Sequence, residues 1–251
     1  MSQITAYLQR IGYQGIPKND YNTLHDLQRL HLQSVPYENL DIMRGIPISL
    51  DVGNIFEKIV LRGRGGYCFE LNALFAWLLR CLGFDVTDYM ARFLQGTTEI
   101  PMRRHRVLKV TCAGEEYLVD VGCGRVIPRK PLPIIAGNVS EQNGEKYVLE
   151  NEDFLGYVLY EWRQDSWRRI YSFTDEPQLE QDFTAVSFYC EAHPDSFFRT
   201  QDMVHIFTDG GRKTVAGGEV RLFTAGGVKV ITPATKEVYH ELLHTHFGIR
   251  M

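Results

Sequence analysis

Cys68 lies where a glycine-rich segment meets an apolar one, in the stretch RGRGGYCFELNALF of residues 62–75. Glycines allow a sharp backbone turn, so we expect Cys68 in the first turn of a helix. The N–H groups and the dipole of a helix start stabilise a thiolate and lower its pKa. A cysteine at this place is a nucleophile, a metal ligand or a buried apolar residue, and its position alone does not distinguish the three.

A nucleophilic cysteine needs a base, and the base needs a residue that orients it. The segments HRVLKVTC and EEYLVDVG, joined by AG, predict a β-hairpin that carries both. With Ala113 and Gly114 at the turn, His105 lies opposite Gly122, and Asp120 is its diagonal neighbour on the same face. The hairpin thereby brings an imidazole and a carboxylate within reach of each other, as a solvated pair or as a catalytic one.

The remaining cysteines give a weaker signal. The chain has five cysteines at irregular spacings, with no CxxC pair typical of a zinc or redox site. An odd number also argues against a disulfide framework. We therefore expect Cys81, Cys112 and Cys190 to be small buried side chains in a reducing compartment.

The composition is typical of a globular protein, with 251 residues, 44% apolar residues and a formal net charge of -4. This charge gives no general attraction to nucleic acid or to an anionic membrane. No stretch reaches the roughly 18 apolar residues of a membrane span, and the N-terminus lacks the apolar segment of a secretory signal. The sequence predicts a cytoplasmic protein with neither nucleic acid nor membrane as a partner.

Helical patterns fill residues 1–83. Leucines recur at helical spacing in residues 24–32, after the capping residues Asn19 and Asp20, and VGNIFEKIV predicts a further helix. The segment after Cys68 has the clearest helical pattern. We expect a helical bundle that carries the nucleophile.

The pattern changes at Phe84 to alternating runs rich in β-branched and aromatic residues, which predict an antiparallel sheet or barrel. Further short strands and a final helix, from about Pro233 to His246, follow the segment HPDSFF. Together with the helical bundle, these elements predict the α+β class, with three regions that pack against one another.

HELLH, residues 240–244, matches the HExxH pattern of zinc metalloproteases, with His240 and His244 one helical turn apart. Catalytic zinc needs a third protein ligand, and His246 points to a different face of the helix. The segment RGRGG lacks the GK[ST] ending of a phosphate-binding loop. We therefore expect neither a metal site nor a nucleotide loop of this kind.

RGGYCFELN, HRVLKV and YLVDVGCG follow one another along the chain. With VPYENLDI near residue 35, HPDSFF at 193 and the C-terminal FGI, they resemble the arylamine N-acetyltransferases, whose shared pattern is Arg-Gly-Gly-x-Cys, a lone His on a strand and Asp-Val-Gly-x-Gly. The resemblance covers nearly the whole chain. One position departs from the pattern, because Cys123 stands where the family usually has an aromatic residue.

The resemblance implies a helical bundle over residues 1–83, a β-barrel over 84–190 and an α/β lid over 191–251. It also implies a catalytic core related to those of cysteine proteases and transglutaminases. In this core Cys68 is the nucleophile, His105 the base, and Asp120 the residue that orients His105.

The implied reaction carries acetyl from acetyl-coenzyme A (acetyl-CoA) to arylamines, arylhydrazines or N-hydroxyarylamines through an acetyl-cysteine, without a metal, in xenobiotic metabolism. A cysteine hydrolase, or a transglutaminase-like acyltransferase with another acyl donor, is the alternative, because the same three side chains can pass an acyl group to water.

The donor and the acceptor each need binding residues near Cys68, His105 and Asp120. A tetraanionic coenzyme needs local positive charge, for which the arginines of MRRHR and of HPDSFFR are candidates. Backbone N–H groups near Cys68 and in residues 122–124 are candidates for an oxyanion hole. The predicted acceptor contacts are Tyr37, Gly122, Cys123 and Gly124, and the predicted CoA contacts are Arg103, Arg104, Ser196 and Arg199.

Overall fold

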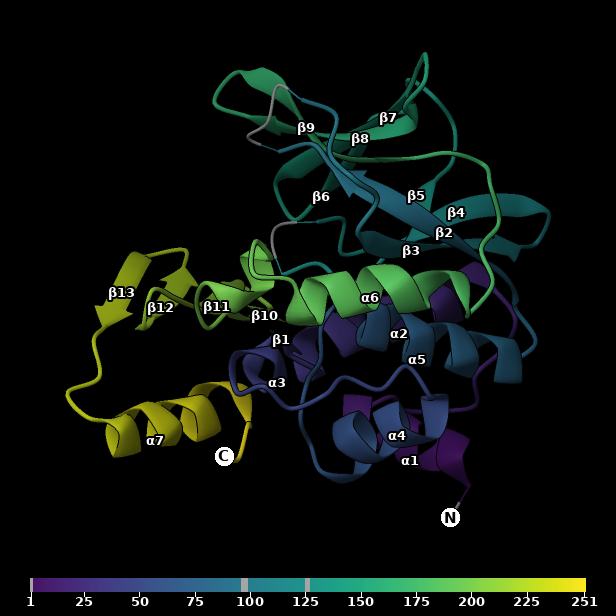
Figure 1. Cartoon of the computed structure of the whole chain (residues 1–251). Helices are drawn as coiled ribbons and strands as arrows, with labels where there is room; N and C mark the ends of the chain where they lie inside the picture. The colour runs from purple at the N-terminus through teal and green to yellow at the C-terminus, as the bar shows by residue number, and fades with distance from the viewer. Residues whose placement is uncertain (1, 96–98, 125–126) are drawn as a thin grey trace.

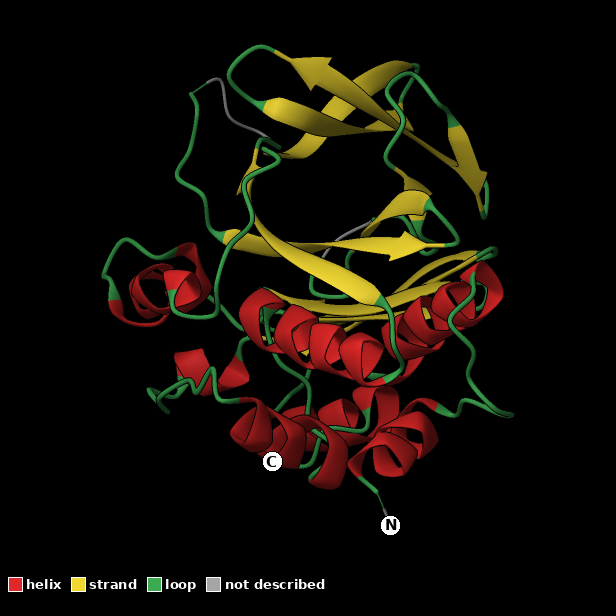
Figure 2. Cartoon of the chain, turned by 90° about the vertical axis from the view of Figure 1, so that its right-hand side faces the viewer, coloured by secondary structure: helices red, strands yellow, loops and turns green. Residues whose placement is uncertain are grey.

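The computed structural model describes residues 2–95, 99–124 and 127–251. A layer of helices lies beneath a large curved sheet, and a smaller sheet with helix α7 stands to one side (Figure 1). The view turned by 90° separates the strands above from the helices below (Figure 2). This mixed arrangement confirms the predicted α+β class.

The helices in the described ranges are α1 (Gln3–Ile11), α2 (Tyr21–Ser34), α3 (Leu40–Met43), α4 (Val52–Phe56), the π-helical η1 (Glu57–Leu61), α5 (Cys68–Cys81), α6 (Asp182–Ala192), the short 3-10 helix η2 (Phe197–Arg199) and α7 (Lys236–Phe247). None of them combines the length and apolarity needed to span a membrane.

The strands are β1 (Tyr37–Glu38), β2 (Asp85–Phe93), β3 (His105–Cys112), β4 (Glu115–Val119), β5 (Leu132–Pro133), β6 (Ser140–Gln142), β7 (Glu145–Glu152), β8 (Gly156–Arg163), β9 (Ser166–Phe173), β10 (Val204–Thr208), β11 (Gly211–Ala216), β12 (Glu219–Thr224) and β13 (Gly227–Ile231).

Two of the helices predicted from the sequence can be compared directly with the structure. The side chain of Asp20 accepts a hydrogen bond from the Thr23 N–H at 2.8 Å, which confirms the predicted cap of α2. The expected single helix VGNIFEKIV is wrong in part, because it changes from α4 to the π-helical turn η1 at Glu57. There the N–H of Arg62 bonds the carbonyl of Glu57, five residues earlier.

The large sheet has eight strands in the order β5-β4-β3-β2-β9-β8-β7-β6, and all its neighbours are antiparallel. Ala136, just after β5, forms a bridge with Leu149 of β7 and brings the two ends of the sheet together. The sheet is therefore nearly closed, as the predicted barrel requires.

The hairpin β3–β4 has the predicted register. Cys112 pairs with Glu115 across the turn, and both Ala113 and Gly114 have positive φ angles, as the tight turns of hairpins require. Continuing this register toward the other end of the hairpin sets His105 opposite Gly122, where the site is formed.

The smaller sheet has the order β1-β10-β11-β12-β13. Its first strand comes from the helical region, because Tyr37 and Glu38 pair with His205 and Val204 of β10. The chain thus ties its first and last regions together beside the glycine segment, where Tyr37 also bridges to Gly66.

Helix α6 has no counterpart among the sequence expectations. It lies alongside α5 beneath the large sheet (Figure 1) and packs Phe183 against Phe69 of α5. The hydroxyl of Ser187 is hydrogen-bonded to Tyr67, the residue before Cys68. Helix α6 therefore covers the start of the helix that carries the nucleophile.

Candidate active site

Cys68 is the first residue of α5 and only 2% exposed. Its Sγ lies 3.9 Å from the carbonyl oxygen of Arg104, the residue directly before His105. The prediction that Cys68 lies at the start of a helix is therefore confirmed, and the side chain lies beside the strand that carries His105.

Burial raises the pKa of the Cys68 thiol well above its ordinary value, and the neighbouring Cys190 and Asp120 raise it further. A hydrogen bond from the backbone of Arg106 acts in the opposite direction. The expectation that the helix start lowers this pKa is wrong, because removing the sulfur from water penalises its charged form more strongly. The thiol therefore depends on a base that takes its proton.

His105 and Asp120 form a fully buried pair. The ring Nε2 donates to Oδ2 of Asp120 at 2.7 Å, as the predicted hairpin geometry implies. A carboxylate only accepts, so this bond fixes the tautomer and leaves the lone pair of a neutral ring on Nδ1. Among the described residues, Nδ1 has no hydrogen-bond partner. His105 thus has one nitrogen held by Asp120 and one available to a reacting group.

Asn72, one turn after Cys68 on α5, connects the helix to this pair. Its Nδ2 donates to Oδ1 of Asp120 at 2.9 Å and to the carbonyl of Arg106 at 2.6 Å, while its Oδ1 accepts from the Val121 N–H at 3.0 Å. The sequence analysis missed this residue. A polar side chain inside the apolar run CFELNALF was the available signal.

Gly122 fits tightly between the helix and the strand end. Its N–H donates to Oδ1 of Asp120 at 2.8 Å, so this predicted oxyanion donor is already engaged. A Cβ atom here would stand 2.6 Å from Asn72 Nδ2 and 2.8 Å from Cys68 Cα. The glycine therefore lets Asp120, Asn72 and Cys68 approach one another.

A charged cluster holds the turn on the other side of Cys68. Glu70 accepts from the backbone N–H of Tyr67 at 3.1 Å and from Nζ of Lys58 at 2.8 Å. Lys58, in the π-helical turn η1, also lies 2.7 Å from Oδ2 of Asp41. The helix start is thus anchored by side chains remote in sequence.

Arg64 completes this cluster. Its Nη2 donates to Oδ1 of Asp41 at 2.8 Å and to Oε2 of Glu38 at 3.0 Å. Glu38 also accepts from the Gly65 N–H at 3.2 Å. We call Glu38, Asp41, Lys58, Arg64 and Glu70 the charged anchor.

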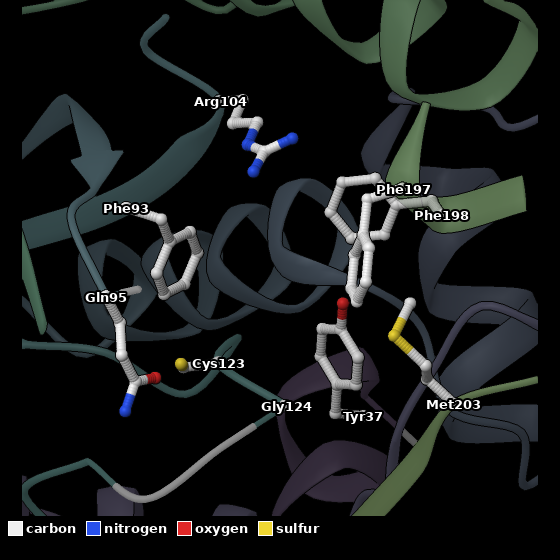
Figure 3. A pocket seen from close by; sticks show the side chains of 9 residues that line it. All are labelled: Tyr37, Phe93, Gln95, Arg104, Cys123, Gly124, Phe197, Phe198 and Met203. Carbon is white, nitrogen blue, oxygen red and sulfur yellow. The ribbon is translucent and has the colours of Figure 1, made fainter. Parts of the chain in front are cut away.

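A cavity of about 260 Å³ opens beside Cys68, His105 and Asp120, with aromatic side chains facing it from several elements (Figure 3). Phe93 connects the cavity with these residues, since its ring centroid lies 4.8 Å from that of His105. Gly124 admits the ring of Tyr37, because a Cβ there would stand 2.4 Å from it. The lining residues are Tyr37, Phe93, Gln95, Arg104, Cys123, Gly124, Phe197, Phe198 and Met203.

Comparison with known proteins decides the family. The N-acetyltransferase family model matches residues 20–251. An arylamine N-acetyltransferase of Mycobacterium tuberculosis is 35% identical over 254 residues, covering 99% of this chain and 89% of that protein. The chain belongs to the arylamine N-acetyltransferase family. The family resemblance read from the motifs is thereby confirmed.

Solved structures of arylamine N-acetyltransferases share the whole fold. The enzyme from Salmonella typhimurium superposes with a TM-score of 0.95 at 28% identity, covering 99% of this chain and 92% of that one. The Mycobacterium marinum enzyme, solved in complex with CoA, gives 0.91 at 32% identity, covering 98% and 92%. The predictions of an enzyme and of its fold are confirmed.

The arginines near the strand that carries His105 have different surroundings. Arg103 donates to Glu176 at 2.6 Å and to Thr174 at 3.0 Å, whereas Arg104 lines the aromatic cavity. Arg106, in the same MRRHR segment, is fully buried and bonds Asp88. Only Arg104 of the three reaches the cavity of this N-acetyltransferase.

The other predicted CoA contacts lie near η2. Ser196 is 1% exposed, donates to the Cys190 carbonyl and accepts from the Phe198 N–H. Arg199 donates to the carbonyl of Ala192 at 2.7 Å. Ser196 therefore caps η2, and Arg199 ties it to α6.

The HELLH segment forms part of α7. Nε2 of His244 accepts a hydrogen bond from Nε of Arg250 at 3.3 Å. In the described ranges, no three His, Cys, Asp or Glu side chains gather so that they could hold a metal ion.

Proposed function

We propose that this chain transfers acetyl from acetyl-CoA to arylamines, arylhydrazines or N-hydroxyarylamines through an acetyl-Cys68 intermediate. The observation that carries the proposal is the buried Asp120–His105 pair, whose Nδ1 has no partner in the described ranges, next to the helix start that bears Cys68. Family membership supports the reaction type, and the CoA complex of the M. marinum relative supports the donor.

In the first half-reaction, Sγ of Cys68 attacks the thioester carbonyl and its proton passes to Nδ1 of His105. The tetrahedral intermediate collapses, the bond to the CoA sulfur breaks, and the CoA thiolate takes the proton from His105. One thioester replaces another, so the step is nearly isoenergetic. Asp120 stabilises the imidazolium while it exists.

In the second half-reaction, the amine nitrogen attacks the carbonyl of acetyl-Cys68. His105 accepts a proton from the attacking nitrogen, and the Cys68 thiolate leaves. The product amide departs, and the thiolate recovers its proton from His105. The same base therefore serves both half-reactions.

Burial and pocket shape favour this transfer over hydrolysis. Cys68, His105 and Asp120 are each at most 3% exposed, so water has poor access to the acetyl-enzyme. The aromatic cavity of about 260 Å³ is smaller than typical drug-binding pockets and suits a compact, flat acceptor. Tyr37, Cys123 and Gly124 are the predicted acceptor contacts that line it.

Steady-state kinetics and cysteine replacement test the proposal together. We expect parallel lines in double-reciprocal plots when acetyl-CoA and an aniline acceptor are varied, because one site is used twice. Replacing each cysteine in turn by alanine should abolish transfer only at Cys68. Cys81 is the control, because as the last residue of α5 it is exposed; the expectation that it is buried is wrong, whereas Cys112 and Cys190 are buried as expected. Intersecting lines, or an active Cys68→Ala enzyme, would contradict the proposal.

A further inference from the structure

The aromatic cavity beside the nucleophile is lined almost entirely by uncharged groups. Its rings come from Tyr37, Phe93, Phe197 and Phe198. Among the lining residues that the structure describes, Arg104 alone has a charged side chain. A few polar groups in an apolar pocket fix the orientation and the specificity of its ligands, so this cation has a strong influence on which acceptors bind.

Arg104 differs from the arginines on either side of His105 in having no protein partner for its charge. Arg103 donates to Glu176 at 2.6 Å, and Arg106 donates to Asp88 at 2.8 Å. The half-buried guanidinium of Arg104 makes no hydrogen bond or ion pair with any residue in the described ranges. A guanidinium offers five N–H donors and keeps its charge, so these donors are left for water or for a ligand.

The backbone of Arg104 fixes its place next to the nucleophile. Its N–H donates to the carbonyl of Ala91 on β2 at 3.0 Å, and its own carbonyl oxygen lies 3.9 Å from Sγ of Cys68. The side chain extends from there over the cavity, and its guanidinium lies between the ring of Phe93 and the rings of η2 (Figure 3). An acceptor bound between these rings therefore has the nucleophile near one of its groups and a cation near another.

The charge of Arg104 also reaches the covered side of the site. Burial raises the pKa of Cys190 to about 12, and Arg104 opposes this rise. Cys190 in turn raises the pKa of the Cys68 thiol, so the two sulfurs share one electrostatic environment with Arg104. A cation without a counterion in a partly desolvated pocket favours a ligand that brings an anionic group.

We infer that Arg104 selects acceptors with an anionic group, namely aromatic amines or hydrazines that carry a carboxylate on the ring. The rings of the cavity stack on the acceptor ring, the guanidinium binds the carboxylate, and the amine lies at Cys68. The inference rests on the proposed function, because it assumes that the acceptor enters this cavity to reach acetyl-Cys68.

Two acceptors of nearly equal shape isolate the effect of the charge. We would prepare the acetyl-enzyme with acetyl-CoA, remove the CoA, and measure the second half-reaction with 4-aminobenzoate and with the neutral 4-aminobenzamide. In Arg104→Gln, the ratio of the two second-order rate constants, acid over amide, should fall roughly fivefold to thirtyfold, as expected for a charge-assisted hydrogen bond lost at a half-buried site. The ratio cancels differences in folding and in acetylation by the donor, because both acceptors meet the same acetyl-enzyme.

Arg103→Gln is the matched control. It removes the same charge one residue earlier, but Arg103 is held by Glu176 and Thr174 and does not line the cavity. Its ratio of acid to amide should stay within about twofold of the native ratio, because a charge at a distance is screened by salt. A native ratio in Arg104→Gln, or an equal fall in both variants, would overturn the inference. Slower acetylation by acetyl-CoA in Arg104→Gln with an unchanged ratio would assign Arg104 to the donor and would overturn it as well.

Binding of an unreactive acid separates this inference from the proposed function. 4-Methylbenzoate has the ring and the carboxylate but no amine, and 4-methylbenzamide is its neutral counterpart. In NMR titrations, the native chain should bind the acid more tightly than the amide, and this difference should shrink in Arg104→Gln but not in Arg103→Gln, even if no acetyl-enzyme forms. Failure to form an acetyl-enzyme would overturn the proposed function alone. Equal affinity of the native chain for the acid and the amide would overturn the selectivity of Arg104 alone.

Discussion

The start of α5 is held by charged side chains, whereas its second turn is held to the barrel by a neutral amide. In the charged anchor, three carboxylates and two cations share the glycine turn before Cys68. On the barrel side, the one side chain of Asn72 bonds Asp120, Val121 and Arg106.

The difference matches what each region must do. The charged anchor fixes backbone, so its net charge matters little to the reaction. Asn72 touches the carboxylate that stabilises the His105 cation, where a second charge would change the proton affinity of the pair. The comparison predicts that damage to the anchor lowers stability, and that damage at Asn72 lowers catalysis.

The largest expected effect is on stability. Lys58→Met leaves Asp41 and Glu70 without their shared cation, and loss of one partner from a buried ion cluster costs about 3–5 kcal/mol. Denaturant unfolding should show this loss, while protein that stays folded keeps most of its acetylation rate. Lys146→Met, at an exposed pair, should cost less than about 1 kcal/mol. A strong loss of rate in folded Lys58→Met protein would contradict the comparison.

Asn72→Asp tests the neutral amide with a nearly isosteric change. A carboxylate would face Oδ1 of Asp120, and the two would compete for one proton. The acetylation rate constant should fall about tenfold to a hundredfold, as expected for one lost hydrogen bond to a charged group. Its pH profile should shift as well, which a purely structural change would not produce. An unchanged profile would refute the role of Asn72 in positioning Asp120.

Acid unfolding sharpens the comparison further. Burial alone raises the pKa of Asp41, but Lys58 and Arg64 together hold it below its ordinary value. The contribution of Asp41 to the free energy of unfolding is therefore complete above a pH of about 3.9, and it is lost as pH falls through the lower pKa of the folded state. Asp41→Asn should flatten the dependence of unfolding free energy on pH in this window, by up to about 1.4 kcal/mol per pH unit.

Lys146→Met, at the exposed pair, is the contrasting variant for this measurement. It should leave that slope nearly unaltered, because it removes no group of the charged anchor. Glu70 acts in a different pH window, because burial raises its pKa above the ordinary value. Its contribution to the free energy of unfolding is present below that ordinary value and is lost as pH rises through the higher pKa of the folded state. If the free energy of unfolding fell equally at low pH in Asp41→Asn and in the native chain, the stabilising role of the charged anchor would be contradicted.

The smallest expected effect lies outside both regions. Cys123 lines the aromatic cavity where the family usually has a ring. Cys123→Phe should raise kcat/KM roughly threefold to tenfold for compact planar amines, through about 0.5–1.5 kcal/mol of stacking, and should block bulky ones. Acetylation by the donor should change far less. An equal change over a graded set of anilines and hydrazines would show that this residue does not shape the pocket.

Local signals in the sequence were enough to predict where Cys68, His105 and Asp120 lie, whereas their catalytic roles came from the family resemblance and stay a prediction. The AG turn sets the register of β3 and β4, and that register alone brings His105 to Asp120. The glycine segment and the apolar run after it likewise place Cys68 at a helix start. Each of these features depends on residues close together in the chain.

What the sequence could not predict depends on distant contacts. In the charged anchor Lys58 bonds Glu70, and Arg64 bonds Glu38, 26 residues away in sequence; no local pattern pairs these side chains. The sequence analysis did not predict helix α6, because its apolar side chains occur on more than one face, with Phe183 buried and Phe188 exposed. The raised pKa of Cys68 comes from burial by other elements, which a helix start alone does not reveal.

The central claim is that Cys68 is the residue that carries the acetyl group. The most direct measurement is intact-protein mass spectrometry after mixing the native chain with acetyl-CoA alone, followed by peptide mapping. We predict one added acetyl group, located on Cys68, that disappears when an aniline acceptor is added and that never forms in Cys68→Ala. An acetyl group on another residue, or turnover without any acetylated protein, would contradict the account.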